Sequence, residues 1–162
     1  MRIIRNHATE WGIDPHQVGV MGNSAGGHLA ASLATLYGSD ETRPDFQILL
    51  YPVITMDETY THQGSRVSLL GKNPSQELVD HFSTEKQVKP QTPPAFVVVS
   101  AADDVVPAKN SLDYAAALIQ NNVPVSLHVY PYGCHGFGYS LSFKDADIWH
   151  AELLRWIKRG GK

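Results

Sequence analysis

A Gly-x-Ser-x-Gly pentapeptide at residues 22–26 constrains the local fold more than any other feature of this 162-residue chain. It directly follows the apolar residues 18–21, and small residues such as Ala30 and Ala31 follow it in a stretch typical of a helix. Glycines two positions on either side of a serine are expected where the backbone turns sharply from strand to helix and neighbouring elements leave no room for side chains. We therefore predict a strand, a tight turn that presents Ser24, and a helix.

Strand-like and helix-like segments alternate along the chain. Apolar runs predict further strands at 46–51, 94–100 and 125–130. Helices are expected over 3–11, from the pentapeptide to about residue 38, over 107–121 and over 145–159. Gly12 is expected to end the first of them. Alternation of this kind favours one three-layer α/β/α domain around a mainly parallel sheet with right-handed crossovers.

Two downstream residues are candidate partners for Ser24. Asp103 follows the predicted strand 94–100, and His135 lies on a glycine-rich loop after the predicted strand 125–130. A serine nucleophile needs a histidine base that is oriented by a carboxylate, and the order Ser, Asp, His along the chain suits such a triad. His135 would take the proton from Ser24 as it attacks an acyl carbonyl, and the backbone N–H of Ala25 would stabilise the resulting oxyanion.

Each of these residues also has a structural alternative. Ser24 would suit a tight turn that binds phosphate or simply packs against a helix. Asp103 and Asp104 would suit an exposed turn or the cap of the helix beginning near Pro107, Asp104 especially. His135 would suit a turn without a catalytic role, although its flanking glycines favour a ring that needs room.

The other histidines and the single cysteine give weaker signals. His28, one helical turn after Ser24, would either line a pocket or pack at the helix start. No histidine pair has the spacing of metal ligands, so neither a metal nor another cofactor is expected. Cys134 is the only cysteine, which excludes an internal disulfide. It lies on the same loop as His135 and after the acid, so it does not have the place in the chain that the nucleophile would have.

Four segments together resemble a known family. Residues 22–30 (GNSAGGHLA), 51–54 (YPVI), 103–111 (DDVVPAKNS) and 135–138 (HGFG) are similar to the α/β-hydrolases called acetylxylan esterases or xylanase-associated lipases and esterases. The resemblance implies a serine carboxylesterase that removes small acyl groups, chiefly acetyl and sometimes aromatic acyl, from plant polysaccharides or similar esters. It implies Ser24 and His135 as catalytic residues and selects Asp103 over Asp104, because the family's acid stands in Asp-x-x-Val-Pro.

The resemblance also implies a difference at the N-terminus. Members of the family have several strands before the serine turn and a His-Gly-Gly-Gly loop that supplies a second oxyanion donor. This chain has neither, so we expect the C-terminal part of an α/β-hydrolase domain without its N-terminal strands. The localisation stays open, because an export signal would lie in the absent part.

Residues 55–94 interrupt the alternation with polar sequence, and a connection of this length is usually functional. We expect a small lid or pocket wall, with a short helix introduced at 73–75 and ending near Phe82. Tyr60, Phe82 and, outside this segment, Phe137 are candidates to contact an acyl or sugar group. The alternative for each of them is an inert position on the surface.

Composition and architecture leave two other functions open. A net charge of −3 gives no basic surface for nucleic acid, and no signal peptide or membrane span is visible. One alternative is a peptidase of the prolyl-oligopeptidase type, which has similar C-terminal motifs. The other is a truncated, non-catalytic product that associates with itself through an exposed sheet edge or apolar helix faces.

Overall fold

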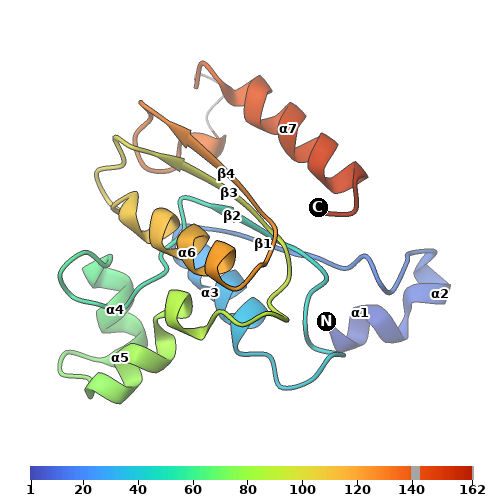
Figure 1. Ribbon diagram of the computed structural model, residues 1–162, viewed down its shortest axis with the longest axis horizontal. Coiled ribbons are helices and arrows are strands. Elements are labelled where there is room, and N and C mark those ends of the chain that lie inside the picture. Colours follow the sequence, from blue (N-terminus) through green and yellow to red (C-terminus); the bar gives the residue numbers. More distant parts are fainter. Residues whose placement is uncertain (140–142, 162) are drawn as a thin grey trace.

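A parallel four-stranded sheet lies at the centre of the structure, a computed structural model that describes residues 1–139 and 143–161. The strands lie side by side in chain order (Figure 1): β1 Val20–Asn23, β2 Gln47–Leu50, β3 Ala95–Ser100 and β4 Val125–Tyr130. Every neighbouring pair is parallel. Since β1 and β4 each pair on one side only, they form the two edges of the described sheet.

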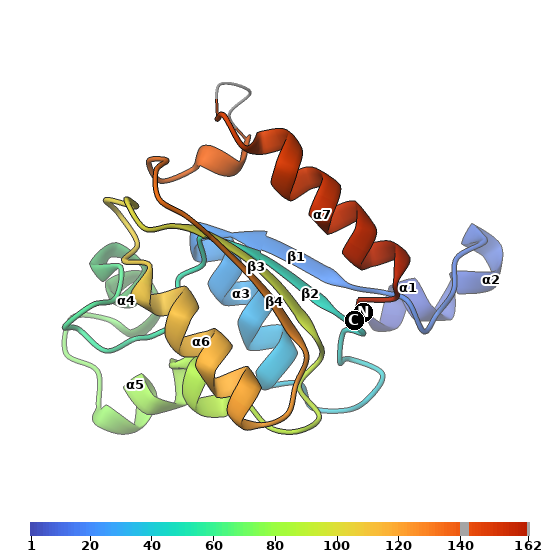
Figure 2. The same cartoon turned by 45° about the horizontal axis from the view of Figure 1, so that its top comes forward.

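Helices cover both faces of this sheet, which confirms the predicted three-layer α/β/α architecture. Helices α3 (Ser24–Thr35) and α6 (Lys109–Gln120) lie on one face and α7 (Ala146–Lys158) on the other (Figure 2). Successive strand residues point to opposite faces. Leu49 therefore packs with the α3 and α6 side chains, whereas Leu50 packs with Trp149 and Trp156 of α7.

Most predicted elements are present, with shifts at their ends. The strand before the pentapeptide begins at Val20 instead of residue 18, because the N–H of Val18 binds the Asp45 carboxylate at 2.8 Å and lies outside the ladder. Helix α3 ends at Thr35, and α6 begins at Lys109 with Ala108 as its N-cap. Asp104 therefore does not cap α6, and that interpretation is wrong.

The N-terminal segment differs most from the prediction. The expected single helix is broken at His7 into α1 (Arg2–Asn6) and α2 (Ala8–Trp11), and Gly12 ends α2 with φ 66° as predicted. The apolar side chains expected to be buried along this helix are exposed to solvent: Ile3 is 70% and Trp11 is 51% exposed. Only Ala8 of the two helices is buried.

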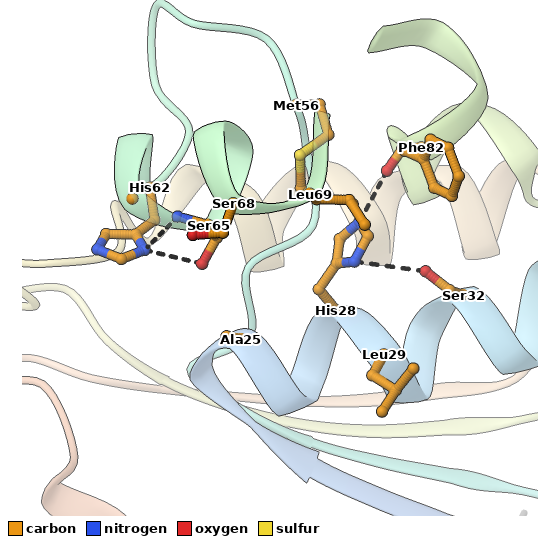
Figure 3. A pocket seen from close by; sticks show the side chains of 11 residues that line it. Ala25, His28, Leu29, Ser32, Met56, His62, Ser65, Ser68, Leu69 and Phe82 are labelled. Carbon is orange, nitrogen blue, oxygen red and sulfur yellow. Dashed lines mark hydrogen bonds between the residues drawn. The ribbon is translucent and has the colours of Figure 1, made fainter. Parts of the chain in front are cut away.

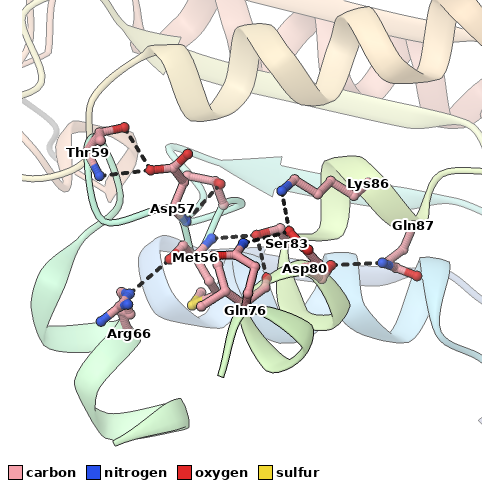
Figure 4. Close-up of polar contacts among 11 residues, drawn as sticks. Met56, Asp57, Thr59, Arg66, Gln76, Asp80, Ser83, Lys86 and Gln87 are labelled. Carbon is pink, nitrogen blue, oxygen red and sulfur yellow. Dashed lines mark hydrogen bonds and ion pairs between the residues drawn. The ribbon is translucent and has the colours of Figure 1, made fainter. Parts of the chain in front are cut away.

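The segment 55–94 forms three short helices: α4 Gln63–Leu70, α5 Gln76–Phe82 and the 3₁₀ helix η1 Thr84–Gln87. The expected helix near 73–82 is confirmed as α5, whose first turn is capped by the Ser75 hydroxyl. The stretch that connects β2 to these helices is held by hydrogen bonds to the backbone of Met56 (Figure 4). Met56 donates its N–H to Ser83 Oγ at 2.9 Å, and its carbonyl accepts from Arg66 Nε at 3.0 Å.

Apolar contacts complete the attachment of this segment. Val79 of α5 and Met56 pack with Val53 and with Val106, which precedes α6. Thus the segment is held against the body of the domain near the carboxyl ends of β2 and β3. Within the described ranges, no helix is long and apolar enough to cross a membrane.

Candidate active site

Ser24 lies at the junction of β1 and α3 in a strained backbone conformation. Its φ is 53°, a left-handed value that is uncommon for a residue other than glycine. Strain of this kind is maintained only where the surrounding structure fixes it, and it clusters at functional sites. Here the Ser24 carbonyl accepts a hydrogen bond from the Val53 N–H at 3.0 Å, which ties the turn to the segment after β2.

Of the two glycines predicted for the turn, Gly22 has no room for a side chain but Gly26 has. A Cβ on Gly22 would lie 2.1 Å from the Gly26 carbonyl oxygen, and one on Gly27 would lie 2.5 Å from Pro52 Cβ. A Cβ on Gly26 would have only Asn23 Oδ1, at 4.0 Å, as a neighbour. The expectation that space requires a glycine at position 26 is therefore wrong, and Gly27 is the second position without room for a side chain.

Ser24, His135 and Asp103 are joined by hydrogen bonds although they are far apart in sequence. His135 Nε2 lies 2.8 Å from Ser24 Oγ, and Nδ1 lies 2.8 and 3.0 Å from the two carboxylate oxygens of Asp103. Because Nδ1 faces a carboxylate, it holds the proton, and Nε2 is left to accept from the Ser24 hydroxyl. This is the geometry that a general base needs.

The Asp103 carboxylate is fixed by its own loop. Its side chain has no exposed surface, and Oδ1 accepts hydrogen bonds from the N–H groups of Val105 at 3.0 Å and Val106 at 2.9 Å. Asp104 is exposed, and its Oδ1 accepts only a long 3.4 Å contact from the His135 N–H. Of the two acids, the structure therefore brings Asp103 to the imidazole.

A buried aromatic side chain packs against the His135 ring. Tyr51, which is 1% exposed, packs edge-on against it with ring centroids 4.9 Å apart. Phe137 lies next to Tyr51 and Phe143 and is 2% exposed, so it belongs to the core and not to an open pocket. Sequence reasoning missed Tyr51, whose signal was its position directly after a buried strand.

A cavity of about 590 Å³ lies between α3 and the segment 55–94 (Figure 3). Ala25, the residue after Ser24, lines it together with His28 and Phe82, so two of the predicted pocket residues face one cavity. Tyr60 is not part of this lining. Its hydroxyl donates to Asp113 of α6 at 2.8 Å, and burial together with this carboxylate raises the pKa of Tyr60 to about 12.

His28 connects the helix after Ser24 to α5. Its Nε2 lies 2.8 Å from the Phe82 carbonyl, and its Nδ1 lies 3.4 Å from Ser32 Oγ (Figure 3). Nε2 must donate to that carbonyl. Burial lowers the pKa of His28, so the ring is neutral near pH 7 and acts as a structural tie as well as a cavity wall.

Between residues 1 and 139 and from 143 to 161, no group of three or more His, Cys, Asp or Glu side chains is arranged to hold a metal ion. Cys134 is exposed and unpaired by any disulfide.

Comparisons with known proteins agree with this architecture. A family model described as the alpha/beta hydrolase fold matches residues 1–139. An acetylxylan esterase of Xylanibacter ruminicola is 40% identical over 161 residues, which are 97% of this chain and 33% of that protein. Endo-1,4-beta-xylanase B of Butyrivibrio fibrisolvens is 42% identical over 146 residues, covering 84% of this chain and 23% of its own length.

Solved structures show the same arrangement over nearly the whole chain. An acetyl ester-xyloside bifunctional hydrolase from Caldicellulosiruptor lactoaceticus matches with a TM-score of 0.91 and 37% identity, covering 99% of this chain and 62% of that one. A carboxylesterase from Lactobacillus plantarum matches with a TM-score of 0.80 and 27% identity, covering 99% and 64%. The chain thus spans about a third or less of the two sequence relatives and under two thirds of these structures.

Proposed function

We propose that this chain, which belongs to the alpha/beta hydrolase fold family, is a serine esterase. It hydrolyses small acyl esters, chiefly acetyl esters of saccharides. The observation that carries the proposal is the hydrogen-bonded series Ser24, His135, Asp103 at the strained turn. A turn that only packs or binds phosphate would not need an imidazole whose second nitrogen faces a buried carboxylate.

The reaction follows from the positions of the protons. Ser24 Oγ attacks the ester carbonyl while His135 Nε2 takes its proton, and the tetrahedral intermediate collapses as His135 protonates the departing alcohol. Water then gives a proton to His135 and attacks the acyl-enzyme. As the second tetrahedral intermediate collapses, His135 returns that proton to Ser24 Oγ, the acid is released and Ser24 is restored. Asp103 stabilises the imidazolium in both halves of the reaction.

Ala25 is the proposed donor to the oxyanion. It is the second residue of α3, where backbone N–H groups have no partner within the helix, and the helix dipole favours negative charge there. Removing one such donor typically lowers turnover by about a hundred- to a thousandfold. The turnover of this chain therefore depends on whether a second donor meets the same oxygen.

Two relatives support an acetylated saccharide as the substrate. One sequence relative is an acetylxylan esterase, and one solved structure is an acetyl ester-xyloside hydrolase. The proposed chemistry uses only the three side chains and water, so it requires no cofactor.

Hydrolysis of 4-nitrophenyl acetate tests the proposal, followed to well beyond one product per protein molecule. The wild type, Ser24→Ala and the control Ser111→Ala should be compared. Ser111 is buried on α6, and its hydroxyl has no hydrogen-bond partner among the residues that the structure describes, so its removal should leave the protein intact. We expect turnover in the wild type and in Ser111→Ala and its loss in Ser24→Ala. Equal rates in all three proteins would refute the proposal.

A second substrate pair separates the esterase from a peptidase. Acetylated xylo-oligosaccharide should release acetate with the wild type, whereas a proline-containing 4-nitroanilide should remain intact. The reverse result would favour the prolyl-oligopeptidase type.

A further inference from the structure

The cavity between α3 and the segment 55–94 begins at the residue next to the proposed nucleophile. Ala25 lines it, and consecutive Cα atoms lie about 3.8 Å apart. An ester whose carbonyl oxygen met the Ala25 N–H would lie beside the end of the cavity that Ala25 lines. The remaining walls come from α3 on one side and from α4 and α5 on the other (Figure 3).

The chemistry of the lining selects the kind of group that fits. Five lining side chains are apolar: Ala25, Leu29, Met56, Leu69 and Phe82. Among the described residues that line it there is no Asp, Glu, Lys or Arg side chain. An ion that entered would lose its hydration without meeting a counter-charge, which is strongly unfavourable. An uncharged and mainly apolar group is therefore favoured.

Five lining side chains are polar (His28, Ser32, His62, Ser65 and Ser68), and the first four already form hydrogen bonds within the walls. Both ring nitrogens of His28 are engaged, and His62 Nδ1 accepts from the Ser65 N–H at 3.3 Å and lies 2.9 Å from its hydroxyl. These bonds hold the walls together. They leave little directional hydrogen bonding for a saccharide ring, which displays hydroxyl groups on every side.

The size of the cavity exceeds what an acetyl group needs. An acetyl group has three non-hydrogen atoms, whereas about 590 Å³ lies within the range of sites for ligands the size of a drug, roughly 300–1,000 Å³. The wall that limits the cavity at α5 is fixed, because the His28 bond to the Phe82 carbonyl ties that helix to α3. Leu69, which is 47% exposed on α4, forms a wall open to solvent.

We propose that this cavity binds an uncharged apolar substituent of the ester that is longer than acetyl, and that Leu69 and Phe82 determine its length. The substituent is either the acyl chain or the alkyl group of the alcohol. This inference rests on the proposed function, and it extends the specificity from acetyl saccharides to apolar esters.

Two isomeric esters separate the acyl from the alcohol side. Methyl hexanoate and pentyl acetate have the same composition, but one has the long chain on the acyl side and the other on the alcohol side. For each, the readout is the ratio of its kcat/KM to that of methyl acetate. The variants are Leu69→Trp, which fills the cavity, and Val67→Trp as the matched control. Val67 lies on the same helix, is 41% exposed and does not line the cavity.

We expect Leu69→Trp to lower the ratio for one isomer about tenfold, the effect of losing the burial of roughly two methylene groups. Leu69→Ala should raise the same ratio, and Val67→Trp should leave it unchanged. A selective loss for methyl hexanoate assigns the cavity to the acyl chain, and one for pentyl acetate assigns it to the alcohol. Unchanged ratios for both isomers in Leu69→Trp would overturn the inference.

A binding measurement that needs no turnover separates the test of the cavity from the test of the proposed esterase function. Ser24→Ala protein should be titrated with each isomer by NMR, with and without Leu69→Trp. If the wild type hydrolyses no ester but Leu69→Trp weakens binding of one isomer in the Ser24→Ala protein, the cavity inference stands and the proposed function fails. Equal binding with and without Leu69→Trp would refute the cavity inference in the same experiment.

Discussion

Replacing each glycine of the serine turn by alanine should produce opposite effects at Gly22 and Gly26. At Gly22 the new Cβ would lie 2.1 Å from the Gly26 carbonyl oxygen and 2.5 Å from its carbon, both of them backbone atoms that no side-chain rotation can move. Forcing atoms into a packed site typically costs about 1–3 kcal/mol. Because the backbone of the turn itself must shift, we expect Gly22→Ala to lower the free energy of unfolding by about 3 kcal/mol or more.

Gly26→Ala should stabilise the protein instead. Gly26 lies within the first turn of α3, and its Cβ would have only one neighbour, at 4.0 Å. Alanine in place of glycine within a helix stabilises it by roughly 0.5–1 kcal/mol. Gly27→Ala combines both effects, since this helix gain is set against a contact of 2.5 Å with Pro52 Cβ, and a net loss is expected.

Urea denaturation of the three variants and the wild type measures these differences. With an unchanged dependence on urea, the shift in midpoint reports stability directly. The predicted order of stability is Gly26→Ala above the wild type, then Gly27→Ala, then Gly22→Ala. A Gly26→Ala protein as unstable as Gly22→Ala would refute the reasoning, because the motif and not the local space would then decide which glycine is required.

Three further predictions concern catalysis, pH dependence and association. Asp103→Asn should lower kcat for 4-nitrophenyl acetate about 10⁴-fold, because an amide no longer fixes the His135 tautomer; a fall below tenfold would contradict this role. Burial raises the pKa of Glu85, so its ionised carboxylate lowers the stability of the fold as pH rises through that pKa. Glu85→Gln should therefore raise the urea midpoint at pH 7 but not in acid, and an equal gain at both pH values would contradict this. Met21 is 48% exposed on the edge strand β1, so light scattering should show self-association of the wild type that Met21→Lys reduces; a monomeric wild type at every concentration would exclude it.

The sequence predicted the three-layer fold and the residues that meet at its edge for a specific physical reason. Ser24 directly follows β1, and Asp103 and His135 lie on the loops that follow β3 and β4. The carboxyl ends of parallel strands lie at one edge of a sheet. Three local patterns therefore sufficed to predict neighbours separated by as many as 111 residues. Their catalytic roles remain proposals.

What the sequence could not predict depends on packing between distant segments. Phe137 is an aromatic residue beside His135 and was therefore expected to contact substrate, but it packs against Tyr51 and Phe143 in the core. The contact with Tyr51 joins segments that are far apart in the chain. Helix α4 was missed because it is polar and contains Gly64, and its stability comes partly from the Arg66 bond to the Met56 carbonyl. The choice between Gly26 and Gly27 likewise depended on where Pro52 lies.

Location of a covalent adduct tests the central claim most directly. A fluorophosphonate ester that cannot turn over should be incubated with the wild type and with His135→Ala, and the modified residue identified by peptide mass spectrometry. The account predicts one adduct, on Ser24, in the wild type and its near absence in His135→Ala, because Nε2 of that ring takes the Ser24 proton. An adduct on another serine, or equal labelling of Ser24 in both proteins, would contradict it.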